Sequence, residues 1–198
     1  MKVFNIGLPK TGTSSLNEAL IILGYRSLHN PLDLRMASYR QGVYRYARDD
    51  WDAITNFGEH FYPQLDQNYP GSKFILTVRD RDAWLKSTEK WYSQPPMYPP
   101  RDNQSRLETF GCITFSYERF AYLYEHHTEG VKRYFEHRPD DLLISEVGQD
   151  EPWLDICQFL DKPVPNQPYP HSNNRAGKFH RAARLRRQLA TWVRYGGR

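Results

Sequence analysis

The first 23 residues constrain the fold more than any other part of the chain. A short apolar run, Val3–Ile6, ends at Gly7, and a loop with a second glycine, Gly12, follows it. The next apolar positions recur at helical spacing: Leu16, Ala19, Leu20 and Leu23. Glycines permit backbone conformations that a Cβ resists. A strand, a glycine-containing turn and a helix start, in this order, predict a loop whose backbone N–H groups bind a phosphate-like anion.

The residues of this loop differ from those of the nucleotide triphosphatases. The spacing Gly7-x4-Gly12 matches their P-loop, but Thr13 stands where they have a lysine that reaches the β- and γ-phosphates. The cation here is Lys10, inside the loop. Hydroxyl groups surround Gly12, and they belong to Thr11, Thr13, Ser14 and Ser15. We therefore expect an anionic group other than a triphosphate.

Further strands and helices alternate along the rest of the chain. The apolar runs predict strands at 52–57, 73–79 and 142–144. Helical patterns cover 61–69, 80–91, 110–135, 153–160 and 178–195. Three stretches are interpreted as connections: 30–50, with a short helix, and the proline-rich 93–106 and 161–170. The first proline-rich stretch could form a lid over a site.

This alternation predicts an α/β fold of three layers, with a central parallel sheet and helices on both faces, similar to that of P-loop proteins. We expect one domain over residues 1–198. Ligands of such folds bind at the carboxyl ends of the strands. Four predicted strand ends should therefore share one edge of the sheet, at Gly7, Asn56–Phe57, Arg79 and Ser145–Glu146.

The composition narrows the class of protein. The formal charge of +4 suits an anionic cofactor, and the basic residues are too spread out for a nucleic-acid binder. Cys112 and Cys157 are too few for a metal site or a disulfide framework, and each is expected to be buried within a helix. We expect no signal peptide, and no apolar run reaches membrane-spanning length. We expect a soluble, cytoplasmic protein.

Two residues after the clearest strand form a second anion motif. Arg79 ends that strand and Ser87 lies eight residues on, about one turn into the next helix, so a guanidinium and a hydroxyl can converge on one phosphate. The loop PKTGTSS, the stretch YPGSKFILTVRDRDAW and the tail around Trp153 and Cys157 together resemble sulfotransferases that use 3′-phosphoadenosine 5′-phosphosulfate (PAPS).

The resemblance implies a cofactor, a set of binding residues and a reaction. The cofactor is PAPS, bound at its 5′-phosphosulfate by Lys10, Thr11, Gly12, Thr13, Ser14 and Ser15. Arg79 and Ser87 bind the 3′-phosphate, and Arg175 is the candidate for a late Arg-x-Gly loop. The reaction is in-line transfer of a sulfuryl group to a hydroxyl or amine of a small-molecule, lipid or sugar acceptor. Lys10 and nearby N–H groups stabilise the leaving oxygen, and no metal is required.

The general base departs from the pattern of the family. Sulfotransferases place a His, Glu or Asp near the end of the second strand or just after the first helix. Asn56 stands at the strand end and cannot take a proton. Glu59 and His60 follow it, and His29 is a third candidate. The sequence favours His60 or Glu59 over His29 by a narrow margin.

Other interpretations stay open at this point. A P-loop kinase would require Mg²⁺ and a lysine after Gly12, and Thr13 opposes it. A non-catalytic module that binds a 3′-phosphorylated nucleotide fits Asn56. Basic residues near the C-terminus are interpreted as a solvated face rather than a nucleic-acid site: Arg181, Arg184, Arg186, Arg187 and Arg194. The acceptor is undetermined, and a homo-oligomer could form through the 110–135 helix or the C-terminal helix.

Overall fold

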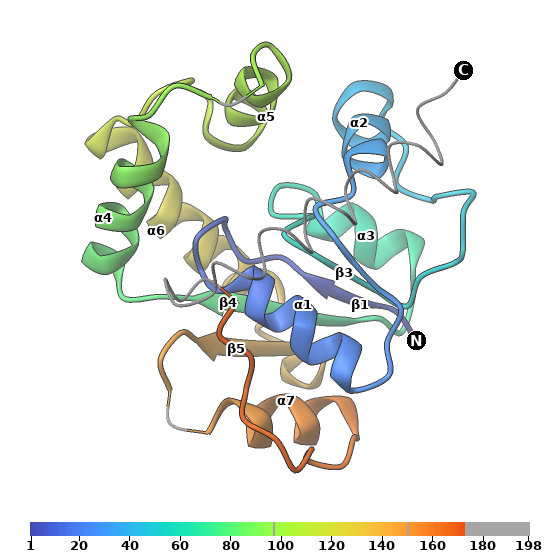
Figure 1. Cartoon of the computed structure of the whole chain (residues 1–198). Coiled ribbons are helices and arrows are strands. Elements are labelled where there is room, and N and C mark those ends of the chain that lie inside the picture. Colours follow the sequence, from blue (N-terminus) through green and yellow to red (C-terminus); the bar gives the residue numbers. More distant parts are fainter. Residues whose placement is uncertain (97, 150, 173–198) are drawn as a thin grey trace.

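A five-stranded sheet with every strand parallel forms the centre of the molecule (Figure 1). The computed structural model describes residues 1–96, 98–149 and 151–172. The strand order is β2-β3-β1-β4-β5. The strands are β1 (Val3–Asn5), β2 (Ser27–His29), β3 (Ala53–Thr55), β4 (Lys73–Val78) and β5 (Leu142–Glu146).

Helices connect these strands. They are α1 (Thr13–Ile22), α2 (Leu32–Gln41), α3 (Tyr62–Asn68), α4 (Arg81–Tyr92), α5 (Arg101–Phe110), α6 (Tyr117–Tyr134) and α7 (Pro152–Leu160), with a 3₁₀ turn, η1 (Pro139–Asp141), before β5. Among the described residues, no helix combines the length and the apolar character that crossing a membrane requires.

The helices cover both faces of the sheet (Figure 1), which confirms the predicted three-layer α/β fold. Successive strand residues point to opposite faces, so Val3 packs with α1 and α7 while Phe4 packs with α3 and α6. A third apolar cluster joins α4 to α5 and α6, and it includes Trp84 and Phe120. Strand β4 lies between β1 and β5 and is buried on both sides, as its unbroken apolar run predicts.

The sequence prediction was wrong in three places. It missed β2, because Ser27–His29 carries no apolar alternation and forms an edge strand that pairs only with β3. It assigned 93–106 to a loop, whereas α5 begins at Arg101; Pro100 lies at the N-cap, before the positions where proline breaks a helix. It drew one helix over 110–135, but Gly111, with φ 71°, ends α5, and α6 begins at Tyr117.

These helix boundaries decide where the two cysteines lie. Cys112 lies after the end of α5 and is half-buried, so the prediction of a buried helical residue is wrong for it. Cys157 is buried in α7, as predicted. The predicted helix 178–195 lies outside the described residues.

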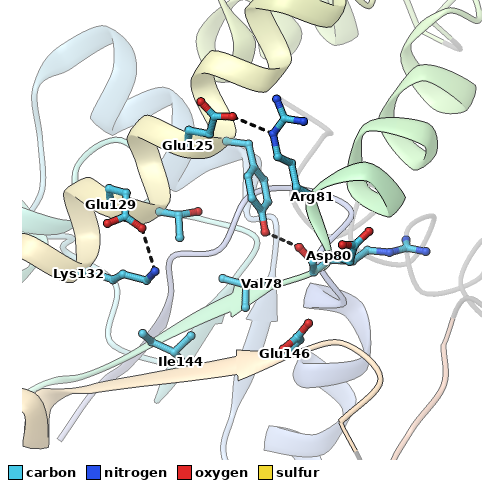
Figure 2. A pocket seen from close by; sticks show the side chains of 11 residues that line it. Val78, Asp80, Arg81, Glu125, Glu129, Lys132, Ile144 and Glu146 are labelled. Atoms are coloured by element: carbon cyan, nitrogen blue, oxygen red, sulfur yellow. Dashed lines mark hydrogen bonds and ion pairs between the residues drawn. The ribbon is translucent and has the colours of Figure 1, made fainter.

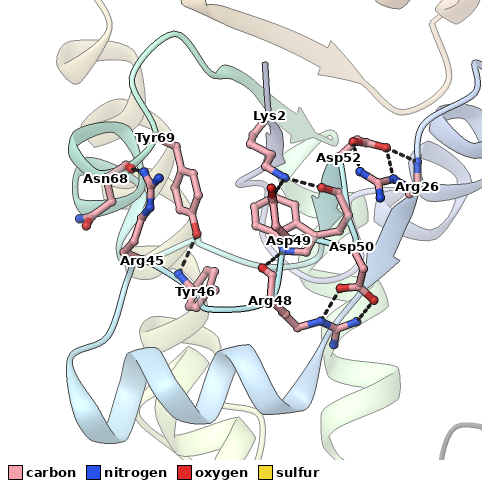
Figure 3. A network of polar contacts seen from close by, with 11 residues as sticks. Lys2, Arg26, Arg45, Tyr46, Arg48, Asp49, Asp50, Asp52, Asn68 and Tyr69 are labelled. Carbon is pink, nitrogen blue, oxygen red and sulfur yellow. Dashed lines mark hydrogen bonds and ion pairs between the residues drawn. The ribbon is translucent and has the colours of Figure 1, made fainter.

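A network of charged side chains ties the amino ends of the strands together (Figure 3). Arg26, before β2, donates to both carboxylate oxygens of Asp52, before β3, at 2.8 and 2.7 Å. The hydrogen bonds from Arg26 lower the pKa of Asp52 well below its usual range. Lys2, before β1, pairs with Asp49. Because this edge is opposite the carboxyl ends of the strands, the network holds the fold and leaves the other edge for a ligand.

Candidate active site

The loop between β1 and α1 is held tightly against the neighbouring strand. A Cβ on Gly7 would lie 2.1 Å from Thr77 Oγ1 and 2.5 Å from the Thr77 carbonyl oxygen, so only glycine fits there. The Thr11 hydroxyl lies 2.6 Å from the Leu8 carbonyl oxygen and 2.7 Å from Thr77 Oγ1. Lys10 and Gly12 take left-handed conformations, with φ 75° and 84°. The chain thus turns twice within three residues and leads into α1.

The start of α1 can receive an anion. Gly12 is the N-cap and has no side chain with which to bond the N–H groups of the first turn. The first turn contains no acidic residue, and it presents the hydroxyl groups of Thr13, Ser14 and Ser15. The helix dipole adds positive potential at this end. The predicted binding residues of the loop therefore lie together around one helix N-terminus.

Helix α4 lies beside this loop. The indole Nε1 of the buried Trp84 donates a hydrogen bond to the Pro9 carbonyl oxygen at 2.9 Å. Two turns further along the same helix face, the Trp91 ring centroid lies 4.4 Å from Lys10 Nζ. Ser87 is half-buried and lies between the two tryptophans at helical spacing, on the face that meets the loop.

Arg79 follows β4 at the carboxyl edge and is half-buried. Its carbonyl oxygen accepts a hydrogen bond from the Tyr124 hydroxyl of α6. A cavity of about 380 Å³ next to it is lined from β4, α4, α6 and β5. Figure 2 shows two ion pairs in this lining, Arg81–Glu125 at 2.8 Å and Lys132–Glu129 at 2.9 Å. Arg79, Asp80 and Glu146 also line this hollow, so its lining mixes basic and acidic side chains.

A second cavity, of about 430 Å³, lies between the start of α7 and the segment that ends the described chain. Trp153 and Tyr169 line it as an edge-to-face pair with centroids 5.1 Å apart, and His171 lies at the same cavity. The next residue, Ser172, donates its backbone N–H to Ser15 Oγ at 3.3 Å. The end of the described chain thus touches the first turn of α1. Arg175 lies outside the described residues, three positions further.

His29, at the carboxyl end of β2, contacts the loop. Its Nε2 lies 3.3 Å from Ser14 Oγ, and its Nδ1 lies 2.8 Å from Thr55 Oγ1. Thr55 Oγ1 also has two oxygen acceptors within reach, Asn17 Oδ1 at 3.2 Å and the Leu28 carbonyl oxygen at 3.4 Å, and when it donates to either one it can accept from Nδ1–H. The arrangement favours the tautomer with its proton on Nδ1. The basic lone pair of Nε2 then faces Ser14.

Glu59 and His60 contact α2 and α5. Glu59 is fully buried and pairs with Arg35 at 3.0 Å. Burial is the largest single effect and favours its neutral form, but the charges of Arg35 and His60 and the hydrogen bonds of the carboxylate together outweigh it and hold the pKa of Glu59 at about 2. His60 lies in a hydrogen bond of 2.8 Å with the Thr109 carbonyl oxygen, to which Nε2 donates. A carboxylate with a low pKa is a poor proton acceptor. The Nε2–H of His60 faces α5, whereas His29 contacts Ser14 in the first turn of α1, so position favours His29.

Sequence reasoning missed the roles of several residues around this edge. Asn56 takes a left-handed conformation with φ 54°, and its N–H donates to Asn5 Oδ1 at 3.1 Å, so it turns the chain. The Arg35 guanidinium is buried and also donates to Thr109 Oγ1 at 2.9 Å. No local pattern marks Arg35, because its partners lie 24 and 74 residues away in the sequence.

His127 is a further buried residue that the sequence did not single out. It lies on α6, and its Nε2 donates to the Ile6 carbonyl oxygen at 2.8 Å, one residue before the loop. Burial lowers the pKa of His127 to about 4, so the imidazole is neutral near pH 7. It fixes the end of β1 from the face of the sheet opposite α1.

Within residues 1–172, apart from 97 and 150, no three His, Cys, Asp or Glu side chains gather as a metal site would require. The fold and the loop define a P-loop-like α/β protein with a candidate anion site at the carboxyl edge of its sheet. A family model described as a sulfotransferase domain matches residues 2–178. The chain belongs to the sulfotransferase domain family.

A curated protein of Aspergillus versicolor, the Ava biosynthesis cluster protein M, is similar to this chain. The two are 30% identical over 217 residues, which covers 86% of this chain and 80% of that protein. These comparisons confirm the resemblance that the loop and strand motifs carry.

Proposed function

We propose that this protein transfers a sulfuryl group from PAPS to a hydroxyl group of a small-molecule acceptor. The observation that carries the proposal is the geometry of the β1–α1 loop, in which two left-handed residues, Lys10 and Gly12, frame a helix N-terminus without acidic residues. A phosphate-like group fits this site through N–H donors and the lysine. Family membership supports the same reaction class.

The remaining contacts fit the rest of the donor. Ser87 lies on the α4 face that meets the loop, and Arg79 follows β4 at the same edge, so they are proposed to bind the 3′-phosphate. The Ser172–Ser15 contact brings the chain to the loop three residues before Arg175, and a span of three residues reaches up to about 10 Å. The cavity beside Trp153 and Tyr169 offers aromatic surface for a flat base.

The donor supplies the sulfuryl group, and this chain's residues stabilise charge and accept a proton. Lys10 and the first N–H groups of α1 are placed to stabilise negative charge on the departing phosphate oxygen. Such donors in a preorganised site contribute about a hundredfold to a thousandfold to the rate each. Because the loop is fixed by Thr11 and Thr77, these groups need little reorganisation.

His29 is the proposed general base. Its Nε2 lone pair faces the first turn of α1, next to Ser14, while Thr55 and Asn17 hold the ring from the other side. A hydroxyl acceptor within hydrogen-bond reach of Nε2 could pass its proton to this nitrogen. Glu59 and His60 remain the alternative bases, and single variants separate the three.

Calorimetric titration tests the donor assignment. We expect 3′-phosphoadenosine 5′-phosphate, the product without the sulfuryl group, to bind more tightly than ADP or ATP with Mg²⁺. Loss of a charge-assisted contact in Arg79→Ala should weaken this binding about tenfold to a hundredfold. The matched control is Arg133→Ala, an exposed arginine on α6. Preference for Mg-ATP, or equal binding by Arg79→Ala and Arg133→Ala, would contradict the proposal and favour a kinase.

A further inference from the structure

An exposed tryptophan lies beside the lysine of the anion loop. Trp91, near the end of α4, is 57% exposed although tryptophan is usually well buried. Lys10 Nζ lies over its ring, 4.4 Å from the centroid, which is a cation–π contact. The protein thus has a flat aromatic surface within contact of the cation that is proposed to stabilise the leaving oxygen.

Trp91 is held in this place by a rigid helix. Trp84, seven residues earlier on the same face, is fully buried and hydrogen-bonded to Pro9 of the loop. Asp80 caps the start of α4 by accepting from the Ala83 N–H at 2.8 Å. The position of the Trp91 backbone is therefore set by α4 and by the contact of this helix with the loop.

Lys10 cannot lie over the ring and contact a phosphate oxygen at the start of α1 with the same ammonium group. A cation–π contact at an exposed site is weaker than a charge-assisted hydrogen bond to phosphate. A bound donor should therefore draw Lys10 away from Trp91. Lys10 covers one face of the Trp91 ring while no donor is bound. When the donor binds, this face becomes open, directly beside the reacting centre.

We propose that Trp91 is the acceptor-binding residue, that it stacks on a planar aromatic alcohol, and that Lys10 covers its ring until the donor binds. The inference rests on the proposed function. It predicts that donor and acceptor bind with positive coupling, because the first releases the surface that the second uses. Losing an exposed cation–π contact corresponds to a coupling of about twofold to fivefold.

The test uses two alcohols of similar size, planar 2-naphthol and its saturated, non-planar counterpart decahydro-2-naphthol. Binding of each is measured with and without saturating 3′-phosphoadenosine 5′-phosphate. The variants are Trp91→Leu, which removes the ring, and Trp91→Phe, which keeps a smaller one. Tyr122→Leu, at an aromatic residue of α6 that is 52% exposed, is the matched control.

The wild type with nucleotide should bind 2-naphthol at least about fivefold more tightly than the saturated alcohol, as expected for aromatic stacking. Trp91→Leu should lose this preference and the coupling, Trp91→Phe should keep part of both, and Tyr122→Leu should keep them in full. The affinity of Trp91→Leu for the nucleotide should not fall, because Lys10 no longer has to leave the ring. Unchanged melting temperatures would show that the variants fold.

Equal preference in the wild type and Trp91→Leu, or no binding of 2-naphthol by the nucleotide-bound wild type, would overturn the inference alone. Failure of the nucleotide itself to bind the wild type would overturn the proposed function, and this inference with it. The same titrations therefore separate the two failures.

Discussion

The stability of the protein should depend on the titration of one buried histidine. His127 donates to the Ile6 carbonyl oxygen and is buried, which lowers its folded-state pKa from 6.5 to about 4. Above pH 6.5 both the folded and the unfolded states carry the neutral imidazole. As the pH falls below 6.5, the imidazole takes up a proton in the unfolded state, whereas in the folded state it stays neutral until about pH 4. The free energy of unfolding therefore decreases over this window.

The magnitude follows from the two pKa values. Between pH 7.5 and 4.5 the linkage relation gives a loss of about 2.5 kcal/mol from this group, a large part of a typical domain's stability. His127→Gln keeps an N–H donor at the position but removes the titration. Urea unfolding of wild type and variant at both pH values isolates the contribution of His127, because the carboxylates that also titrate are common to both proteins.

We expect the variant to lose about 2.5 kcal/mol less than the wild type between these pH values. His137→Gln, at an exposed histidine, is the control and should behave as the wild type. Equal losses in the wild type and His127→Gln would refute the reasoning. That result would mean that His127 can take up a proton in the folded state.

Three further predictions concern the site and its support. His29→Gln should lower kcat about a hundredfold to ten-thousandfold while nucleotide binding changes little, measured by turnover and calorimetry; a larger loss in Glu59→Gln would reassign the base. Arg35→Met should lower the free energy of unfolding in urea by about 3–5 kcal/mol, because it leaves the Glu59 carboxylate buried without its partner. The double variant Arg35→Met/Glu59→Leu should recover much of this loss. Gly7→Ala should abolish nucleotide binding or folding, seen in calorimetry and circular dichroism, since its Cβ would meet Thr77; normal binding would show that the strands can separate there.

The sequence could predict elements whose signal is local and strong. The run that forms β4 is continuous and apolar, and the loop after β1 combines glycines, a lysine and hydroxyl groups within a few residues. By contrast, Ser27–His29 forms β2 only because β3 offers a partner, so its own residues carry no strand pattern. The prolines before α5 led the sequence analysis to predict a loop there. Pro100 lies at the N-cap of α5, where proline destabilises a helix little.

The residues of the candidate site also fall into two groups, those that a local motif marks and those that depend on contacts between distant segments. Lys10 follows from the motif between β1 and α1, and Arg79 and Ser87 follow from the spacing between β4 and α4. The contact of His29 with Ser14 depends on β2 lying next to β3, and the Arg35–Glu59 pair depends on α2 covering the turn after β3. Spacing along the chain does not reveal such contacts between distant segments. The sequence therefore predicts an anion site at this edge from local motifs, whereas its narrow preference for His60 or Glu59 over His29 was made without these contacts.

Transfer of labelled sulfate tests the central claim most directly. PAPS carrying ³⁵S is incubated with the protein and a set of phenols, aliphatic alcohols and sugars, and label in the acceptors is counted for the wild type, Lys10→Met and Lys90→Met. Lys90 is an exposed lysine of α4 and serves as the matched control. The account predicts transfer by the wild type and by Lys90→Met, and a loss of about a hundredfold or more in Lys10→Met. Equal transfer by Lys10→Met, or no transfer to any acceptor by the wild type, would contradict it.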